Sequence, residues 1–263
     1  MTDGFFLYKG IWINKQGITL CSKLTDSECR TLLERGGYVV RNIYNWDKPE
    51  KTSFWYVIKD VFNGMGELPS KVRNQVRKSL KCYEFKLVSY DVMLNLGCDL
   101  FNQSRKRFDE KINITKEGWN KRISDKNLEF WMGFDRETGK PASFSINTLY
   151  NDYCDYTTLG FSLEFPNSTY PLYGLIYEMN RYYLMHKRVA FVCDGARSIT
   201  EHSNIQPFLI NKFKFREAYC DLQIYYRPSL KLAVNILFPF RKWISNRKIT
   251  AMLYQEAMAR GLG

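Results

Sequence analysis

Apolar and polar positions are most clearly patterned in the middle of the chain. Three apolar runs follow one another there, at residues 128–134, 142–150 and 153–161, with short polar segments between them. Runs of this length, rich in aromatic and β-branched residues and bounded by turn-forming residues, are typical of strands. Because the segments between them are too short for a crossover, the pattern predicts an antiparallel meander of three strands.

After these runs the pattern becomes helical. Residues 171–186 begin with a proline, which suits the first position of a helix, and the apolar stretch 188–193 is typical of a strand. A polar loop at 194–203, a second helix ending near residue 215 and a strand at 216–227 complete the series. The sequence therefore predicts the α+β class, with a mixed sheet in which the meander is followed by a β-α-β crossover.

The first part of the chain, residues 1–69, contains short apolar runs around one predicted helix. Thr25 and Glu28 have the spacing of a capping box, which would start this helix. We expect a strand at 38–44 and a loop at 45–51. Two glycines and a proline near the end of this part indicate a boundary. The sequence thus predicts a small α/β appendage ahead of the main domain.

A basic amphipathic helix is predicted directly after the boundary. Three apolar residues recur at helical spacing within 70–81, and a neighbouring row at the same spacing is basic. The basic row consists of Arg73, Arg77 and Lys81. Arginine forks fit phosphate oxygens, so the row is a candidate contact for phosphates or tRNA. A merely solvated helix face is the alternative interpretation.

The last part of the chain, residues 228–263, is predicted to be a helical extension of a main domain that spans 70–227. Within it, 230–244 mixes large apolar and aromatic residues with lysine and arginine, and Pro239 interrupts any helix there. Two alternatives are open for this amphipathic segment. It would either lie at a membrane interface, with its basic residues at the lipid head groups, or pack against the sheet.

Composition narrows the classes of partner. The formal net charge of +12 favours anionic partners such as nucleic acid, an acidic membrane surface or phosphate-bearing ligands. The seven cysteines form no CxxC pair and there are two histidines, so no metal site is expected and the thiols are expected to be reduced. No apolar stretch approaches the roughly 18–20 residues that span a bilayer. These features predict a cytoplasmic protein, with peripheral attachment at the inner face of the membrane through 230–244 as the alternative.

Three segments carry a resemblance to known acyltransferases. Residues 194–216 resemble the loop and helix that follow the penultimate strand in the GNAT superfamily, and the element order is similar. Residues 70–81 resemble the basic helix of FemAB-type aminoacyltransferases, and 170–179 resemble their proline-started helix. The resemblance covers 70–227 and rests on pattern and order. It implies a GNAT-like fold and an acyltransferase that moves an aminoacyl or acyl group to an amine of a cell-envelope or glycan precursor.

The resemblance leaves the acyl donor open among three carriers. GNAT proteins that use acetyl-CoA hold its pyrophosphate on backbone N–H groups of a glycine-rich loop. The corresponding segment here, 164–170, contains no glycine, and Pro166 lacks an N–H group. An aminoacyl-tRNA and an acyl carrier protein thioester are therefore candidates beside acyl-CoA. All three are anionic, and DNA is not expected as a partner.

The candidate site residues lie on the loop and helices that carry the resemblance. A polar cluster follows the strand 188–193 where the crossover begins, an edge at which ligands commonly bind. Catalytic roles are expected for Asp194, Arg197, Ser198 and Glu178, with Glu178 as proton acceptor. Substrate or carrier binding is expected for Tyr173, His202, Asn204, Lys212, Arg73 and Arg77. For each of these residues the alternative is a purely structural role, as a loop residue, a helix cap, a core residue or a solvated surface residue.

Two other functions remain open. One is an acyl-CoA-dependent N-acyltransferase with a degenerate phosphate loop, which stoichiometric binding of CoA would support. The other is a catalytically silent GNAT-fold module that binds RNA or membrane through its basic face. Salt-sensitive binding without turnover would favour this module.

Overall fold

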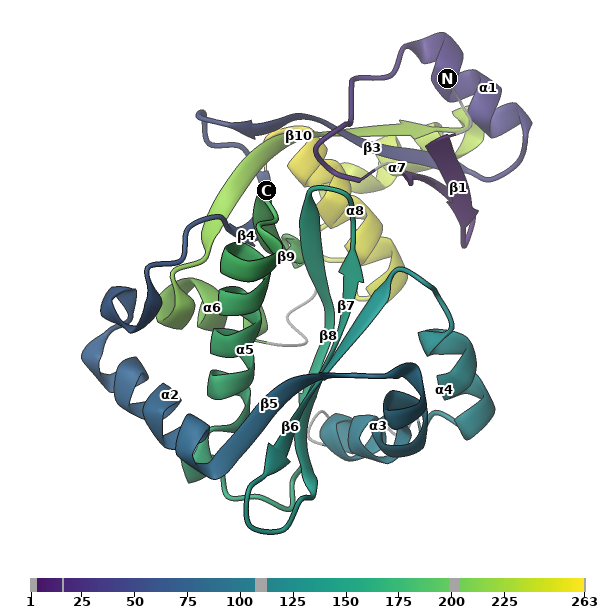
Figure 1. The fold of residues 1–263 in the computed structure, drawn as a ribbon. Helices are drawn as coiled ribbons and strands as arrows, with labels where there is room; N and C mark the ends of the chain where they lie inside the picture. Colours follow the sequence, from purple (N-terminus) through teal and green to yellow (C-terminus); the bar gives the residue numbers. More distant parts are fainter. Residues whose placement is uncertain (1–3, 16, 107–112, 199–203, 263) are drawn as a thin grey trace. The chain divides into compact units, whose positions relative to one another are not determined.

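A computed structural model describes residues 4–15, 17–106, 113–198 and 204–262 of the protein. Contacts divide the chain into two compact units. The first, which we call the terminal unit, comprises 1–56, 196–201 and 217–263, and the second, the central unit, comprises 57–195 and 202–216. Figure 1 follows the chain through both units. The predicted boundaries at residues 69 and 227 stay a prediction, because compact units need not coincide with domains.

The central unit is built around strands that follow one another along the chain. Its helices are η2 (Gly64–Glu67), α2 (Ser70–Cys82), α3 (Tyr90–Arg105), α4 (Lys116–Ile123), η4 (Asn167–Thr169), α5 (Pro171–Arg181), the π-helix η5 (Tyr182–Lys187) and α6 (Ile205–Phe213). Its strands are β5 (Tyr83–Val88), β6 (Leu128–Asp135), β7 (Pro141–Leu149), β8 (Tyr153–Phe161) and β9 (Phe191–Ala196), whose last residue belongs to the terminal unit.

These strands form a mixed sheet. β5, β6, β7 and β8 pair antiparallel in chain order, and β8 pairs with β9 in parallel. The connection from β8 to β9 runs through α5, as a parallel pair requires. The α+β class and the mixed sheet that the sequence predicts are therefore confirmed.

Helices cover both faces of the central sheet (Figure 1). On one face, Trp119 of α4 is fully buried and its indole N–H donates to the Met93 carbonyl at 3.0 Å. On the other face, α5 lies against α2 and β5 at Gly174. A Cβ atom at Gly174 would come within 2.3 Å of the Phe85 ring, and its N–H donates to Ser79 Oγ at 3.1 Å. The close approach of these elements thus depends on the missing side chain.

The helix predicted over 171–186 changes its geometry part of the way along. It is α-helical to Arg181 and continues as a π-helix over Tyr182–Lys187. Arg188 then adopts a left-handed conformation with φ of 57°, which ends the helix. The wider π turn places Tyr183 in the core, where it is fully buried.

The strand predicted at 188–193 begins and ends later. β9 starts at Phe191 and continues through Asp194, which the sequence pattern assigns to a loop. The extension depends on a contact with a distant part of the chain. Directly after β9, the Arg197 N–H donates a hydrogen bond to the Trp55 carbonyl at 2.7 Å. Asp194 is therefore a strand residue.

The terminal unit combines the two ends of the described chain. Its elements are β1 (Phe5–Tyr8), β2 (Ile11–Asn14), α1 (Asp26–Glu34), β3 (Val39–Lys48), β10 (Arg216–Tyr226), whose first residue belongs to the central unit, α7 (Pro228–Leu237), η6 (Phe238–Phe240) and α8 (Arg247–Ala259). β4 (Phe54–Lys59) begins in this unit and ends in the central unit. β1 and β2 pair antiparallel, β2 and β3 in parallel, and β3 and β10 antiparallel. The capping box at Thr25 and Glu28 is confirmed, with both hydrogen bonds present.

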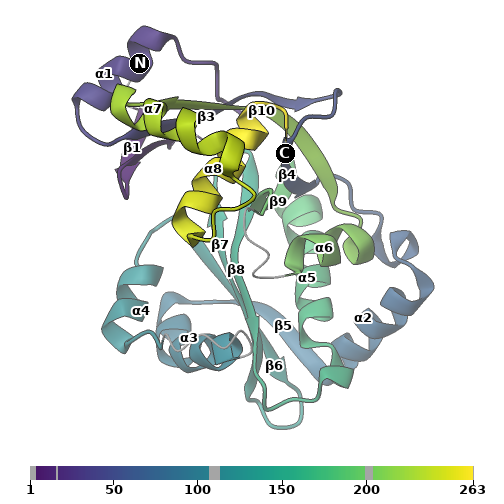
Figure 2. The ribbon, with the colours of Figure 1, turned by 180° about the vertical axis from the view of Figure 1, so that it is seen from behind.

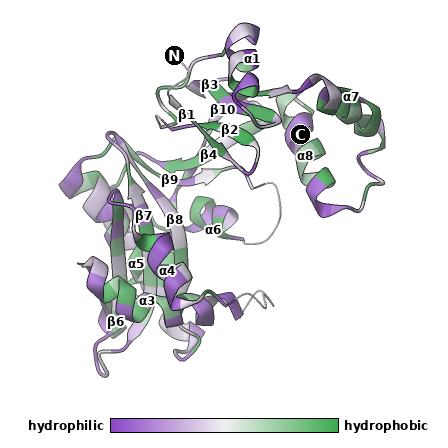
Figure 3. Ribbon diagram, turned by 90° about the vertical axis from the view of Figure 1, so that its right-hand side faces the viewer, coloured by the Kyte–Doolittle hydropathy of each residue, from purple (hydrophilic) through white to green (hydrophobic). Residues whose placement is uncertain are grey.

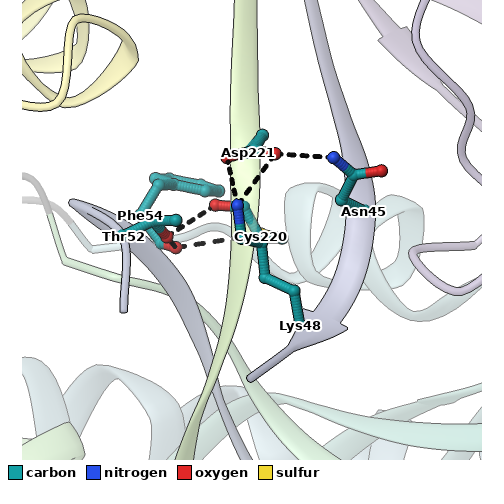
Figure 4. A network of polar contacts seen from close by, with 6 residues as sticks. All are labelled: Asn45, Lys48, Thr52, Phe54, Cys220 and Asp221. Carbon is teal, nitrogen blue, oxygen red and sulfur yellow. Dashed lines mark hydrogen bonds and ion pairs between the residues drawn. The ribbon is translucent and has the colours of Figure 1, made fainter. Parts of the chain in front are cut away.

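The loop predicted at 45–51 is largely strand, since β3 continues to Lys48 against β10. The register shifts there, and Asn45 and Asp47 take positive φ angles to accommodate the extra residues. Figure 4 shows how Asp221 of β10 holds this segment: it accepts hydrogen bonds from Asn45 Nδ2 at 2.8 Å and Lys48 Nζ at 3.2 Å. The pairing partner lies far away in the sequence, so local pattern could not predict this extension.

The helices after β10 pack on the terminal sheet (Figure 2). Val234 and Phe238 are buried with Tyr226 of β10 and Leu253 of α8 in one apolar cluster. α7 ends at Leu237, directly before the turn that contains Pro239, as expected of proline. One side of the segment 230–244 therefore packs against the sheet.

Candidate active site

The parallel pairing of β8 with β9 is short. It joins Tyr153 to Phe191, Cys154 to Val192 and Asp155 to Cys193, and no further pair follows along these fully described strands. Beyond Asp155 the strand β8 continues to Phe161 without a β9 residue opposite it. From this point onward, β9 no longer pairs with the edge of β8 that faces away from β7. We call this place the divergence point.

Two carboxyl groups stand at the divergence point. Asp155 is the last paired residue of β8, and Asp194 follows Cys193, its partner on β9. Burial raises the pKa of Asp155 to about 7. Burial and the nearby charge of Asp155 raise the pKa of Asp194 well above its usual range. Both residues are partly exposed to solvent. Their carboxyl groups therefore have perturbed pKa values and are also accessible from outside the protein.

The residues around the divergence point are fixed by buried polar contacts. Tyr156, directly after Asp155, is buried and its hydroxyl donates to Asn180 Oδ1 of α5 at 2.9 Å. In the same layer Trp131 Nε1 and Asn147 Nδ2 each donate to the Tyr183 hydroxyl at 3.1 Å. Satisfied buried networks of this kind hold a strand in one position. β8 therefore presents Asp155 on a rigid base.

The backbone after Asp194 is also constrained. Gly195 has a φ of +82°, which favours glycine, and its N–H donates to Cys193 Sγ at 3.1 Å. Gln206 of α6 donates to the Asp194 carbonyl at 3.4 Å. Burial raises the pKa values of Cys154 and Cys193 well above the usual value. These thiols are therefore protonated at neutral pH, and a covalent cysteine intermediate is not favoured.

An aromatic cluster lies at the start of α5. The ring of Tyr173 contacts Tyr170 at 5.3 Å, Phe208 at 5.1 Å and Phe213 at 5.8 Å between centroids. Tyr170 itself has a left-handed backbone and caps α5 without a side-chain hydrogen bond. The contacts of Tyr173 join α5 to α6, so the structure shows a packing role for this residue. A role in substrate binding remains a prediction.

Among the predicted catalytic residues, Asp194 alone lies at the divergence point. Glu178 of α5 forms an ion pair with Arg181 at 2.5 Å, so its carboxylate already has a cationic partner. Arg197 belongs to the terminal unit, where its guanidinium donates to the Ser53 carbonyl at 2.7 Å and the Tyr254 hydroxyl at 2.9 Å. It also stacks over Trp55 at 4.2 Å. These contacts give Arg197 a structural part.

The remaining predicted residues lie elsewhere along the described chain. Ser198 is exposed at the end of the segment that follows β9, and Asn204 provides the carbonyl that accepts from the Phe208 N–H at the start of α6. Lys212 lies in the last turn of α6. Arg73 and Arg77 lie on α2, where Arg77 is exposed. His202 lies outside the described residues.

Asp155 was not among the residues predicted from the sequence. The available signal was a carboxylate inside an apolar strand, since Asp155 follows Tyr153 and Cys154 and precedes Tyr156. A charged residue in such a run is rarely buried without a partner or a function. Its proximity to Asp194 depends on the parallel register of two separate strands, which no local pattern reveals.

Neither a metal site nor a membrane-spanning helix occurs in the part of the chain that the structure describes. No group of three or more histidine, cysteine, aspartate or glutamate side chains there could hold a metal ion. No helix among the described residues is long and apolar enough to cross a bilayer.

Comparison with known proteins defines the fold. Neither a protein-family model nor a curated protein sequence matches the chain. The crystal structure of FemX is similar with a TM-score of 0.54 and 10% identity, over 79% of this chain and 69% of that one. The C-terminal domain of a putative lysylphosphatidylglycerol synthetase from Agrobacterium fabrum is similar with a TM-score of 0.51 and 11% identity, over 81% and 68%. The protein therefore shares the fold of FemX and of this synthetase domain, in agreement with the FemAB-type likeness that the sequence indicated.

Proposed function

We propose that the protein is an aminoacyltransferase that acts at the divergence point of β8 and β9. The observation that carries this proposal is the pair of partly accessible carboxyl groups there, one of which has a pKa of about 7. A general base is most effective when its pKa lies near the working pH.

In the proposed reaction Asp155 accepts a proton from the ammonium group of the acceptor. The freed nitrogen attacks the carbonyl carbon of the aminoacyl ester, and a tetrahedral intermediate forms. When the C–O bond breaks, the leaving oxygen takes the second proton of the nitrogen, and Asp155 releases the first proton to solvent. An amide and a free hydroxyl result, and Asp155 returns to its carboxylate form.

The donor in this proposal is an aminoacyl-tRNA. The basic row of α2 and the net charge of +12 suit a polyanion, and the segment ahead of α5 lacks the glycines that cradle a pyrophosphate. The acceptor is an amine of a cell-envelope precursor. The likeness in fold to FemX and to the lysylphosphatidylglycerol synthetase domain supports this choice.

The donor is tested with three labelled carriers. We expect the full chain to transfer label from charged tRNA to a cell-wall precursor peptide with a free lysine amine, and to leave acetyl-CoA and acyl carrier protein thioester unused. Label would be measured in the peptide after separation from the carrier. If label were transferred from a thioester alone, the thioester and not aminoacyl-tRNA would be the donor. If no carrier gave transfer, the proposed function would be contradicted.

Charge reversal on α2 tests the carrier contact. Arg73→Glu together with Arg77→Glu should weaken binding of charged tRNA by tenfold or more, because each arginine would contact a phosphate. The slope of log affinity against log salt should fall by about 1 for each phosphate that an arginine no longer neutralises. Fluorescence anisotropy at several salt concentrations measures both quantities.

The control for this pair is Lys126→Glu, an exposed lysine in the turn before β6. This substitution also makes the net charge less positive, but it leaves α2 unchanged. If Lys126→Glu weakened binding as much per charge as the α2 variant, the effect would be one of net charge and the carrier contact on α2 would be wrong.

A further inference from the structure

The segment from Arg227 to Gln255 has an unusual charge pattern. It contains six lysines and arginines and no aspartate or glutamate. The six are Arg227, Lys231, Arg241, Lys242, Arg247 and Lys248. In the structure Lys231, Lys242 and Lys248 are exposed. The segment therefore presents positive charge to the surroundings without nearby carboxylates of its own to offset it.

The same segment exposes large apolar side chains. α7 buries Val234 against the terminal sheet, while Leu232 and Ile236, one turn apart, are 63% and 58% exposed. Beyond the helix, Phe240 is 51% and Trp243 is 80% exposed, and their rings lie 6.0 Å apart. We call these four exposed residues, Leu232, Ile236, Phe240 and Trp243, the apolar ridge. Figure 3 shows α7 largely in the green of hydrophobic residues.

A shallow hollow adjoins the apolar ridge. It has a volume of about 510 Å³ and a mostly apolar lining. Ser229 and Ala233 of α7 line it, next to Leu232 and Ile236 around the helix, and Lys9 and Tyr38 line its other side. Apolar surface thus continues from the ridge into a recess with a cation at its margin.

We propose that the apolar ridge and its lysines dock the protein on an anionic lipid bilayer. Aliphatic side chains one turn apart, aromatic rings beside them and flanking lysines form the pattern that inserts into the boundary between head groups and acyl chains. Contiguous exposed apolar surface is unfavourable in water and marks an interaction surface. The single sign of charge selects an anionic partner, and the exposed leucine and isoleucine favour acyl chains over nucleic acid.

This proposal does not depend on the proposed reaction. All the residues that carry it belong to the terminal unit, whereas Asp155 and Asp194 belong to the central unit. A bilayer surface would give an envelope enzyme access to an acceptor carried by a lipid, but docking is measurable without any turnover.

Vesicle co-sedimentation of the full chain tests the docking. We expect binding to vesicles of phosphatidylglycerol mixed with phosphatidylcholine and little binding to phosphatidylcholine alone. Leu232→Glu and Trp243→Glu should each weaken binding by roughly tenfold or more, since each removes an inserting apolar group and adds a repelled charge. Lys242→Gln should weaken binding by about fivefold.

The matched control is Leu20→Glu, because Leu20 is a loop leucine of the same unit that is 68% exposed. It adds the same charge away from the ridge and should keep nearly full binding. Far-UV circular dichroism and thermal unfolding of each variant establish that the fold is retained. Equal losses of binding in all three glutamate variants, equal binding to neutral vesicles, or no binding by the unmodified chain would each overturn the proposal. Binding of an RNA oligomer would be measured with the same variants. The proposal would also be overturned if Leu232→Glu and Trp243→Glu weakened binding of the RNA but left binding of the vesicles unchanged.

Discussion

Asp155→Asn is expected to lower the rate of aminoacyl transfer by about 10²–10⁴-fold. Asparagine keeps the size of the side chain but cannot accept the ammonium proton. Because the pKa of Asp155 is raised to about 7, the carboxylate form that acts as base appears as the pH rises through that value. The rate of the unmodified protein should therefore increase with pH up to about 7 and then level off, and this dependence should be absent in the variant.

The measurement is transfer of labelled amino acid from charged tRNA at a series of pH values on both sides of 7. Asp99→Asn, which alters an exposed aspartate of α3, serves as the control and should retain the rate and the pH profile. Circular dichroism checks that both variants fold. A variant at Asp155 with an unchanged rate and profile would remove that residue from the mechanism and leave Asp194 to be tested in the same way.

Trp119→Ala is expected to lower the free energy of unfolding by about 3–5 kcal/mol. Trp119 is fully buried between α3 and the sheet, where its ring lies 5.3 Å from that of Phe101 and 6.4 Å from that of Phe144. Truncation leaves a cavity that close packing cannot fill. It also removes the indole donor to the Met93 carbonyl. Urea unfolding followed by far-UV circular dichroism measures the change.

Trp243→Ala provides a matched control for this measurement. The same side chain is removed from a position that is 80% exposed, so the free energy of unfolding should change by no more than about 0.5 kcal/mol. Similar decreases in stability at the two positions would contradict the description of Trp119 as part of the core. The comparison also isolates folding from docking, because Trp243 is expected to matter for the second property alone.

Local sequence predicted those elements whose causes are local. The capping box at Thr25 and Glu28 and the helix stop before Pro239 both depend on residues a few positions apart, and both are present. The end of β3 at Lys48 depends on β10 instead, and the extension of β9 past Cys193 depends on pairing with a separate strand. Such contacts carry no signature in either segment alone.

The candidate site shows the same division. Asp194 was predicted because it follows an apolar run at a crossover, a feature of its own segment. Asp155, the proposed base, was not predicted, because the register that sets it opposite Cys193 is not visible in its own segment. Glu178 and Arg197 have the right chemistry in the sequence, but the structure gives each a partner. The i,i+3 spacing on one helix could have indicated Arg181, whereas Tyr254 lies far from Arg197 in the sequence.

The terminal unit is assembled from segments that lie far apart in the sequence, and this affects the order in which its strands can pair during synthesis. β3 pairs with β10, so the ladder from Val39 to Tyr226 cannot close until β10 has left the ribosome. The meander of the central unit pairs neighbours in the sequence and can form earlier. β3 can pair early with β2 but must wait much longer for its other partner, β10. During that interval β3 presents an open strand edge on the side that later pairs with β10, and such an edge can pair with other chains.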